Sequence, residues 1–204
     1  MKKEFYIVFL ITIFNLSSTI AQINLKIGVN IGGQVSSLRG IEYETDNKFD
    51  IVQSVGVNLE LGLSQSVSIV TSVNFERWKK SIDIYYNHYS NESKEGYDFF
   101  NVPLFVRYKF GGQKKYFLDT GGFMNYYNKG QPNGIMPLFI EFEDYNFGLA
   151  FGTGIVFHLN ESWDITIQVR DDIGLSNINK YENQISGNIK TNTIRLIGTL
   201  NFKI

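Results

Sequence analysis

The stretch YNHYSNESKEGY, residues 86–97, brings together the residue types of a hydrolytic site. His88 lies close to Ser90, Glu92 and Ser93, and an acyl-transfer triad consists of a Ser, a His and a carboxylate. These groups must also meet within hydrogen-bond reach, and short spacing along the chain does not ensure that. We therefore interpret this stretch as a polar loop and predict no catalytic residue in it.

The acidic segment IEYETDNKFD, residues 41–50, places Glu42, Glu44 and Asp46 at alternate positions. Oxygen ligands of calcium often recur at this spacing. However, Asn47 stands where an EF-hand loop requires Gly, and Gln53 stands where it requires Glu. We interpret the segment as a solvated acidic loop and predict no metal site.

The remaining composition limits the chemistry further. The 204 residues include no Cys, which excludes disulfides, thiolate catalysis and zinc–thiolate sites. The second of the two histidines, His158, has no predicted Ser partner and is expected on the inner face of a strand end. With 19 basic and 20 acidic residues, there is no basic surplus for nucleic acid. No catalytic, cofactor-binding or metal-binding residue is therefore predicted.

The N-terminus, MKKEFYIVFLITIFNLSSTIAQ, has the organisation of a secretory signal. Lys2 and Lys3 precede an apolar run from Phe5 to Phe14, and small and polar residues follow as far as Ala21. We predict a cleaved signal peptide at 1–21 and a single exported domain at 22–204. No later segment reaches the roughly 18 consecutive apolar residues of a membrane-spanning helix.

The mature sequence alternates apolar and polar residues in eight stretches, which predicts eight strands and no helix. In the stretch NVPLFVRYKF, for example, Val102, Leu104 and Val106 share one face while Arg107 and Lys109 share the other. The predicted strands are 23–31, 54–63, 66–75, 101–110, 116–126, 147–157, 163–171 and 193–204.

The connections between these strands alternate between long and short. Long polar segments follow the first, third, fifth and seventh strands, and segments of only a few residues follow the others. This is the plan of an outer-membrane β-barrel, in which short turns face the periplasm and long loops face outward. We therefore predict an all-β fold, an eight-stranded antiparallel up-and-down transmembrane barrel. One apolar connection segment, IMPLFIEF (135–142), is expected to extend its flanking strands, with docking of a partner as the alternative.

Aromatic residues are expected in two bands that mark the membrane interfaces. One set lies beside the short turns and the C-terminus: Tyr108, Phe110, Tyr116, Phe157, Trp163 and Phe202. The other flanks the long loops: Tyr85, Tyr86, Tyr97, Phe99, Tyr126, Tyr127 and Tyr145.

A soluble eight-stranded barrel that carries an apolar ligand also alternates, but with its apolar face inward. Here the polar face is rich in Gly, Asn, Ser and Thr, which suits the crowded interior of a narrow barrel. Its charges have mixed signs and are expected to pair, for instance Arg107 and Lys109 with Glu60, Asp119 or Asp172. The apolar face carries almost no charge at the strand centres, and this favours lipid outside.

Two irregularities are expected in these strands. Pro103 lacks a backbone donor and a closed barrel has no edge strand, so we predict a bulge or a local break in pairing there. The alternation also shifts near 76–79, which predicts a bulge or the exit of that strand from the membrane.

The sequence resembles the small outer-membrane β-barrel proteins described as porin-like or PorT-type. The resemblance covers Ile23 to Ile204 and rests on IGVNIGG, NVPLFVRYKF, LDTGGF, FGTGIVF and DDIGLSNI. It implies a non-enzymatic protein of the cell outer membrane, and some relatives serve protein secretion. An eight-stranded interior is about filled by side chains, so "porin" does not here imply an open channel.

We therefore expect a narrow filled lumen and long extracellular loops for binding or assembly. The expected partners are outer-membrane lipid and, through the loops, another envelope protein. A lipid-modifying enzyme and a soluble lipocalin-like carrier stay open as alternatives.

Overall fold

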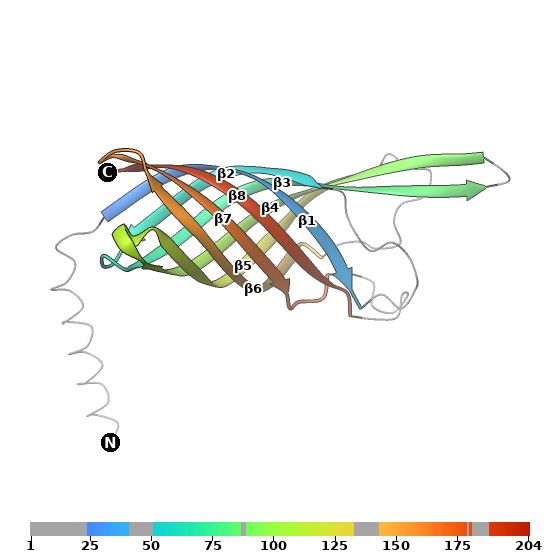
Figure 1. Cartoon of the computed structure of the whole chain (residues 1–204). Coiled ribbons are helices and arrows are strands. Elements are labelled where there is room, and N and C mark those ends of the chain that lie inside the picture. Colours follow the sequence, from blue (N-terminus) through green and yellow to red (C-terminus); the bar gives the residue numbers. More distant parts are fainter. Residues whose placement is uncertain (1–23, 41–50, 87–88, 133–142, 179, 181–187) are drawn as a thin grey trace, which may run out of the picture.

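Eight antiparallel strands form a closed barrel in which each strand pairs with the next and β8 pairs with β1 (Figure 1). The computed structural model describes residues 24–40, 51–86, 89–132, 143–178, 180 and 188–204, and only the backbone of 78–86, 89–96 and 129–132. The strands are β1 Asn24–Arg39, β2 Val52–Gly62, β3 Val67–Tyr86, β4 Tyr89–Phe110, β5 Tyr116–Pro132, β6 Tyr145–His158, β7 Trp163–Gly174 and β8 Lys190–Lys203. The predicted eight-stranded barrel is confirmed.

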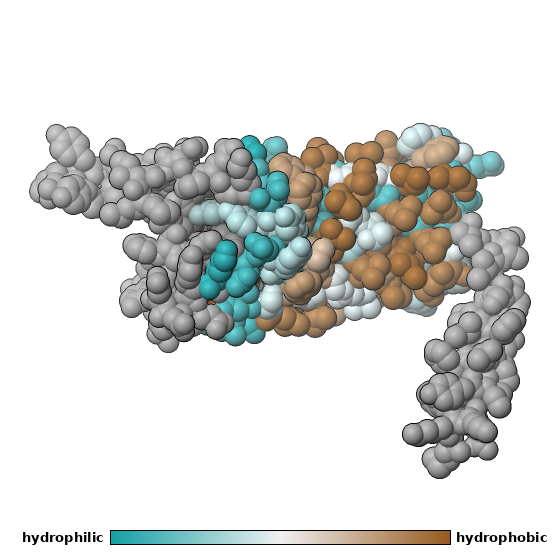
Figure 2. Space-filling model, turned by 180° about the vertical axis from the view of Figure 1, so that it is seen from behind, coloured by the Kyte–Doolittle hydropathy of each residue, from teal (hydrophilic) through white to brown (hydrophobic). Residues whose placement is uncertain are grey.

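The two faces of the barrel have opposite character. Polar side chains such as Asn30, Asn101 and Thr193 are buried inside, whereas apolar ones such as Val29 and Leu104 are exposed outside. Figure 2 shows the resulting belt of apolar side chains, bordered by a polar band toward the end with the long connections. The soluble carrier with an apolar interior is therefore the wrong alternative. In the described ranges no helix is both long and apolar enough to cross a membrane.

Three short connections lie at one end of the barrel, together with the C-terminus (Figure 1). Between β2 and β3, Ser64 Oγ accepts hydrogen bonds from the backbone of Ser66 and Val67. Between β6 and β7, Asn160 Oδ1 accepts hydrogen bonds from the backbone of Ser162 and Trp163. Between β4 and β5, Gly111 adopts a φ of 80° before the 3-10 turn η2, Gly112–Lys114. The predicted order of short connections is confirmed.

Strands β3 and β4 continue beyond the barrel as a two-stranded ribbon (Figure 1). The predicted loop at 86–97 was wrong, because β3 extends to Tyr86 and β4 begins at Tyr89. β2 pairs with β3 only as far as Glu76, and β5 pairs with β4 only as far as Glu95. The β3–β4 register is continuous past Glu76, so the shift in alternation there marks the exit of β3 and not a bulge.

The predicted irregularity at Pro103 is a local break in pairing. The β3–β4 ladder skips the two pairs that would hold Pro103 and Val102. Thr71 Oγ1 donates instead to the carbonyl oxygen of Pro103 at 2.8 Å. On the other side, pairing with β5 runs without a shift through Pro103↔Phe123. A side-chain hydroxyl thus satisfies the carbonyl oxygen of Pro103 where the ladder pairs are missing.

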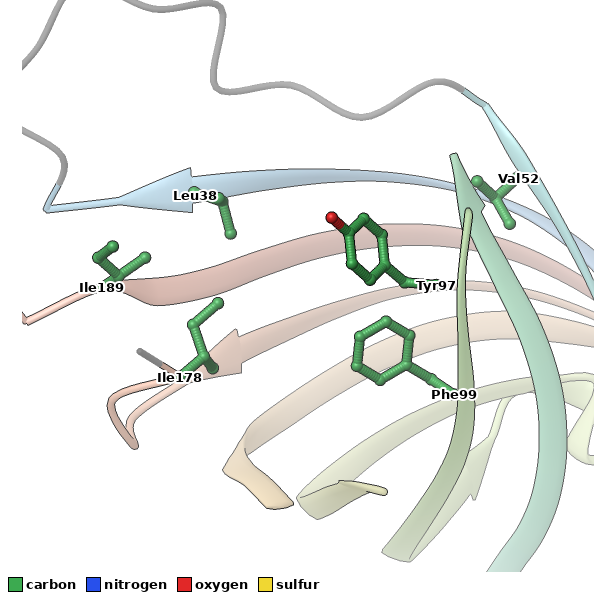
Figure 3. Close-up of a cluster of buried hydrophobic side chains, with 6 residues drawn as sticks. All are labelled: Leu38, Val52, Tyr97, Phe99, Ile178 and Ile189. Atoms are coloured by element: carbon green, nitrogen blue, oxygen red, sulfur yellow. The ribbon is translucent and has the colours of Figure 1, made fainter. Parts of the chain in front are cut away.

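The mouth at the long-connection end contains a buried apolar cluster, which we call the mouth cluster (Figure 3). The expectation that Tyr97 and Phe99 belong to an outer aromatic band was wrong, because both side chains point inward from β4 and are buried. They share the inward parity of Asn101 and pack with Tyr127 of β5, which is half-buried against the cluster and so also departs from the expected outer band. The members of the mouth cluster are Leu38, Val52, Tyr97, Phe99, Ile178 and Ile189.

The exposed aromatic residues otherwise follow the predicted bands. At the short-turn end, all six predicted residues are exposed, and the tilted rings of Trp163 and Phe202 have centroids 4.9 Å apart. At the other end, Tyr126 and Tyr145 are exposed and their rings lie 5.3 Å apart. Tyr85 and Tyr86 lie outside the residues whose side chains are described.

Candidate functional site: the barrel interior and its ends

The interior of the barrel carries a balanced set of charges. These side chains come from seven of the eight strands and are paired within the lumen. The cations are Lys26, Arg107, Lys109, Arg170 and Arg195, and the carboxylates are Glu60, Glu76, Asp119, Asp164 and Asp172. Because the signs balance, the pairing supplies the partners that buried charges require.

A first ion cluster lies toward the short-turn end. Arg107 donates to both carboxylate oxygens of Asp119 at 2.8 Å and to Glu60 Oε2 at 3.1 Å. Lys109 contacts Glu60 Oε1. Gln168 donates to Asp119 Oδ2 at 2.6 Å. The predicted pairing of Arg107 and Lys109 with Glu60 and Asp119 is confirmed, whereas Asp172 belongs to a second cluster.

An aromatic ring closes the space beside this first cluster. The guanidinium of Arg107 lies over the ring of Phe117, 3.9 Å from its centroid, and Phe117 is fully buried. The ring fits because Gly154 has no side chain: a Cβ there would lie 2.4 Å from Phe117 Cζ. A glycine on the inward face therefore provides the room that the aromatic plug occupies.

The second ion cluster lies nearer the mouth. Arg195 pairs with Glu76 and, at 2.6 Å, with Asp172 Oδ2, and Arg170 Nε lies 2.9 Å from Asp172 Oδ1. Gln34 donates to Glu76 Oε2 at 2.9 Å. The sequence pattern did not identify Glu76 as a member, because it lies where the alternation shifts. Glu76 lies two residues after the inward-facing Asn74, and this spacing on a strand is the signal that could have identified it.

Amides, hydroxyls and a small buried apolar cluster (Val70, Phe105, Phe123 and Ala150) occupy the rest of the interior. Asn101 donates to Asn125 at 2.7 Å, Asn30 donates to Asn74 at 2.9 Å, and Thr199 donates to Asn30 at 2.8 Å. The cavity that remains among these groups has a volume of about 20 Å³. That is room for roughly one water molecule.

A wider cavity of about 350 Å³ opens at the short-turn end. Lys26, Glu60, Lys109 and His158 contribute to its lining. His158 has the inward parity expected of it, and its Nε2 lies 3.3 Å from the carbonyl oxygen of Gln113. That contact is to backbone, and among the described residues no hydrogen bond joins His158 to a Ser hydroxyl.

The other residues considered for catalysis or metal binding fall outside the description. His88 and the acidic segment 41–50 lie outside the described residues, as does 135–142. Ser90, Glu92 and Ser93 are described only as backbone. Within the described part of the chain, no group of three or more His, Cys, Asp or Glu is placed to hold a metal ion.

Comparison with protein families identifies the barrel. The family model described as "outer membrane protein beta-barrel domain" matches residues 18–180. The chain belongs to this outer-membrane β-barrel family. It is therefore a protein of the cell outer membrane, and its apolar belt faces lipid. Comparison with curated proteins gave no match.

Solved outer-membrane barrels share this fold at low sequence identity. OprG from Pseudomonas aeruginosa is 12% identical with a TM-score of 0.56, over 89% of this chain and 96% of that one. AlkL, determined in lipid bilayers, is 12% identical with a TM-score of 0.58, over 90% of each chain. Neisserial surface protein A is 12% identical with a TM-score of 0.52, over 87% of this chain and 97% of that one.

In outer-membrane barrels the short turns face the periplasm. This predicts that the wide cavity opens to the periplasm and that the mouth cluster lies at the extracellular end. The PorT-type subtype stays a prediction. The predicted signal peptide at 1–21 lies outside the described residues.

Proposed function

We propose that this outer-membrane barrel is non-enzymatic and acts through its extracellular end, for binding or assembly, and that it is not a pore. The observation that carries the proposal is the filled interior. Two ion clusters, the amides between them and the mouth cluster occupy the lumen in succession from the periplasmic to the extracellular end. An aqueous channel needs a barrel of roughly sixteen strands.

The extracellular end offers the surface for such binding. The β3–β4 ribbon projects beyond the barrel, and within the described residues neither β2 nor β5 pairs with it to its tip, which leaves its backbone edges free there. Free strand edges are a common docking element for extended partner segments. A role as an accessory of protein secretion is consistent with this arrangement and is part of the proposal.

Conductance across a planar bilayer tests the closed lumen. The purified wild-type protein is expected to give no channel steps. A variant with Glu76→Ala and Arg195→Ala removes one buried pair but leaves the first ion cluster, Phe117 and the mouth cluster in place, so it is also expected to give no steps. Steps of equal size in the wild type and in this variant contradict a closed barrel.

Cross-linking and pull-down from membranes test the extracellular end. In one variant an Asn-Gly turn replaces residues 81–94, which removes the ribbon beyond Lys80↔Glu95 and keeps a tight hairpin. The matched control exchanges Gln65 and Gln113 for Ala at the periplasmic end. A protein partner is expected to be lost only with the ribbon, and loss in the control alone would place binding at the other end. An unchanged lipid profile in a deletion strain is expected, because no lipid-modifying activity is proposed.

A further inference from the structure

Two cations face each other on the lipid-facing side of the barrel, at the extracellular ends of β1 and β8. Arg39 and Lys190 are direct cross-strand partners, and both point outward, because Leu38, Ile189 and Thr191 beside them point inward. Like charges directly opposite each other destabilise a sheet. Such a pair is most easily accommodated when an anion lies between the two cations.

The outer surface below this pair changes in steps toward the membrane centre. The next outward pair is Ser37↔Asn192, which is polar and uncharged, and the one below is Val35↔Ile194, which is apolar and exposed. Cationic, hydrogen-bonding and apolar layers thus follow one another on two neighbouring strands. The same order of chemistry runs along a phosphorylated lipid, from phosphate through its polar linkage to its acyl chains.

The pair also lies at the height of lipid headgroups. Ile27 pairs with Phe202 of the periplasmic aromatic band, and Arg39 lies on the same strand twelve residues further along. At a rise of about 3.3 Å per residue and a tilt of roughly 45°, this separation spans roughly 30 Å of the membrane normal. The apolar band of such barrels is about 25 Å tall. Arg39 and Lys190 therefore lie just above the hydrocarbon.

One nearby carboxylate does not neutralise both cations, so the pair of Arg39 and Lys190 keeps a net positive charge. Elsewhere on the rim, Arg77 is held by both oxygens of Asp98, at 2.7 and 2.9 Å, and is neutralised. Near Arg39, the outward-facing Asp171 is the carboxylate that interacts with it. Lys190 has no salt-bridge partner among the described residues.

One side of the Arg39 guanidinium is already fixed in place. Its Nη2 donates to the carbonyl oxygens of Gly174 at 2.9 Å and of Thr191 at 3.3 Å, at the ends of β7 and β8. A guanidinium has five N–H donors, so Nε and Nη1 stay available to a ligand. The hydrogen bonds to the two strands therefore orient a donor that can still bind phosphate.

We propose that Arg39 and Lys190 bind the phosphate of a phosphorylated lipid in the outer leaflet, with Ser37 and Asn192 contacting its polar linkage and Val35 and Ile194 its acyl chains. This site is separate from the extracellular surface proposed above for protein binding. Substitutions that remove the lipid site leave the β3–β4 ribbon unaltered, so lipid binding and protein binding can be tested separately.

Native mass spectrometry of the detergent-purified protein with bisphosphorylated lipid A tests the proposal. One bound lipid per chain is expected for the wild type. A cation near a membrane surface contributes about a fivefold gain in affinity, so Lys190→Gln is expected to weaken binding about fivefold. The variant with both Arg39→Gln and Lys190→Gln is expected to weaken binding about 25-fold. Lys190→Gln leaves the bonds of Arg39 to Gly174 and Thr191 in place, so it tests the site even where the double variant fails to fold.

The matched control removes two cations at the opposite end, with Lys115→Gln and Lys203→Gln, and is expected to bind lipid A as the wild type does. Heat-modifiable gel mobility checks that each variant is folded. Equal binding by the wild type and Lys190→Gln overturns the proposal, and so does an equal loss in the control. Complete displacement of lipid A by millimolar inorganic phosphate overturns the assignment to a lipid and indicates a site for free anions.

Discussion

Arg107 is the residue on which the periplasmic ion cluster depends, because it touches both Glu60 and Asp119 and lies over Phe117. Arg107→Met keeps much of the side-chain volume and leaves two buried carboxylates short of a partner. Breaking a buried pair in this way costs about 3–5 kcal/mol. Urea unfolding of the lipid-refolded protein, followed by tryptophan fluorescence, is expected to show a loss of this size.

Arg77→Met is the matched control for that substitution. Arg77 also binds its carboxylate through two hydrogen bonds, but it is exposed at the rim. Because water solvates both partners after the change, no measurable loss in the unfolding free energy is expected. A similar loss in both variants would show that the charge itself, and not its burial, is what matters.

Individual residues also show what the alternation of polar and apolar side chains can and cannot predict. Parity placed Arg107, Lys109, Glu60 and Asp119 on one inward face, and the four meet there. The pairing of Arg195 with Glu76 could not be predicted in this way. These residues belong to β8 and β3, which are not neighbours, and their contact depends on the shear of the closed barrel.

At the scale of the element, β4 tolerates a proline because a neighbouring strand supplies a hydroxyl. Thr71→Val removes the donor to the carbonyl oxygen of Pro103, in a region without water to replace it. The expected loss in unfolding free energy is about 1–3 kcal/mol. Urea titrations of Thr71→Val in lipid vesicles measure it.

Pro103→Ala provides the second half of a double-mutant cycle. An alanine restores the backbone N–H and lets the skipped pairs of the β3–β4 ladder form. Thr71→Val is therefore expected to cost less in the Pro103→Ala background than in the wild type. Equal costs in the two backgrounds would mean that the hydroxyl does not substitute for the ladder.

The elements that the sequence predicted well are those in contact with lipid. There, one face must be apolar at every second residue, so alternation identifies the strand. Beyond the membrane this requirement ends, and the polar stretch 86–97 has the pattern of a loop although the backbone of residues 86 and 89–97 pairs as strand. Tyr97 and Phe99 were misplaced for the same reason: as parts of a strand they inherit the inward parity of Asn101.

At the scale of the whole molecule, the lipid belt determines which substitutions the barrel accepts. Leu104 is 60% exposed and lies near the middle of the lipid-facing run of β4. Leu104→Arg is expected to lower the unfolding free energy in lipid by about 2–4 kcal/mol. Leu63→Arg, beside a periplasmic turn, is expected to cost about 0–1 kcal/mol. Reversible unfolding from lipid vesicles in urea compares the two, and equal costs would contradict the assigned depth.

The closure of the barrel by β1 and β8 has a consequence for biogenesis. These strands share fourteen register pairs, from Lys26↔Lys203 to Arg39↔Lys190, although they stand at opposite ends of the sequence. Until β8 has been synthesised and exported, β1 has an edge of unpaired backbone groups that lipid cannot solvate. Insertion therefore has to wait for β8, and a truncation that removes β8 leaves a sheet that cannot enter the membrane.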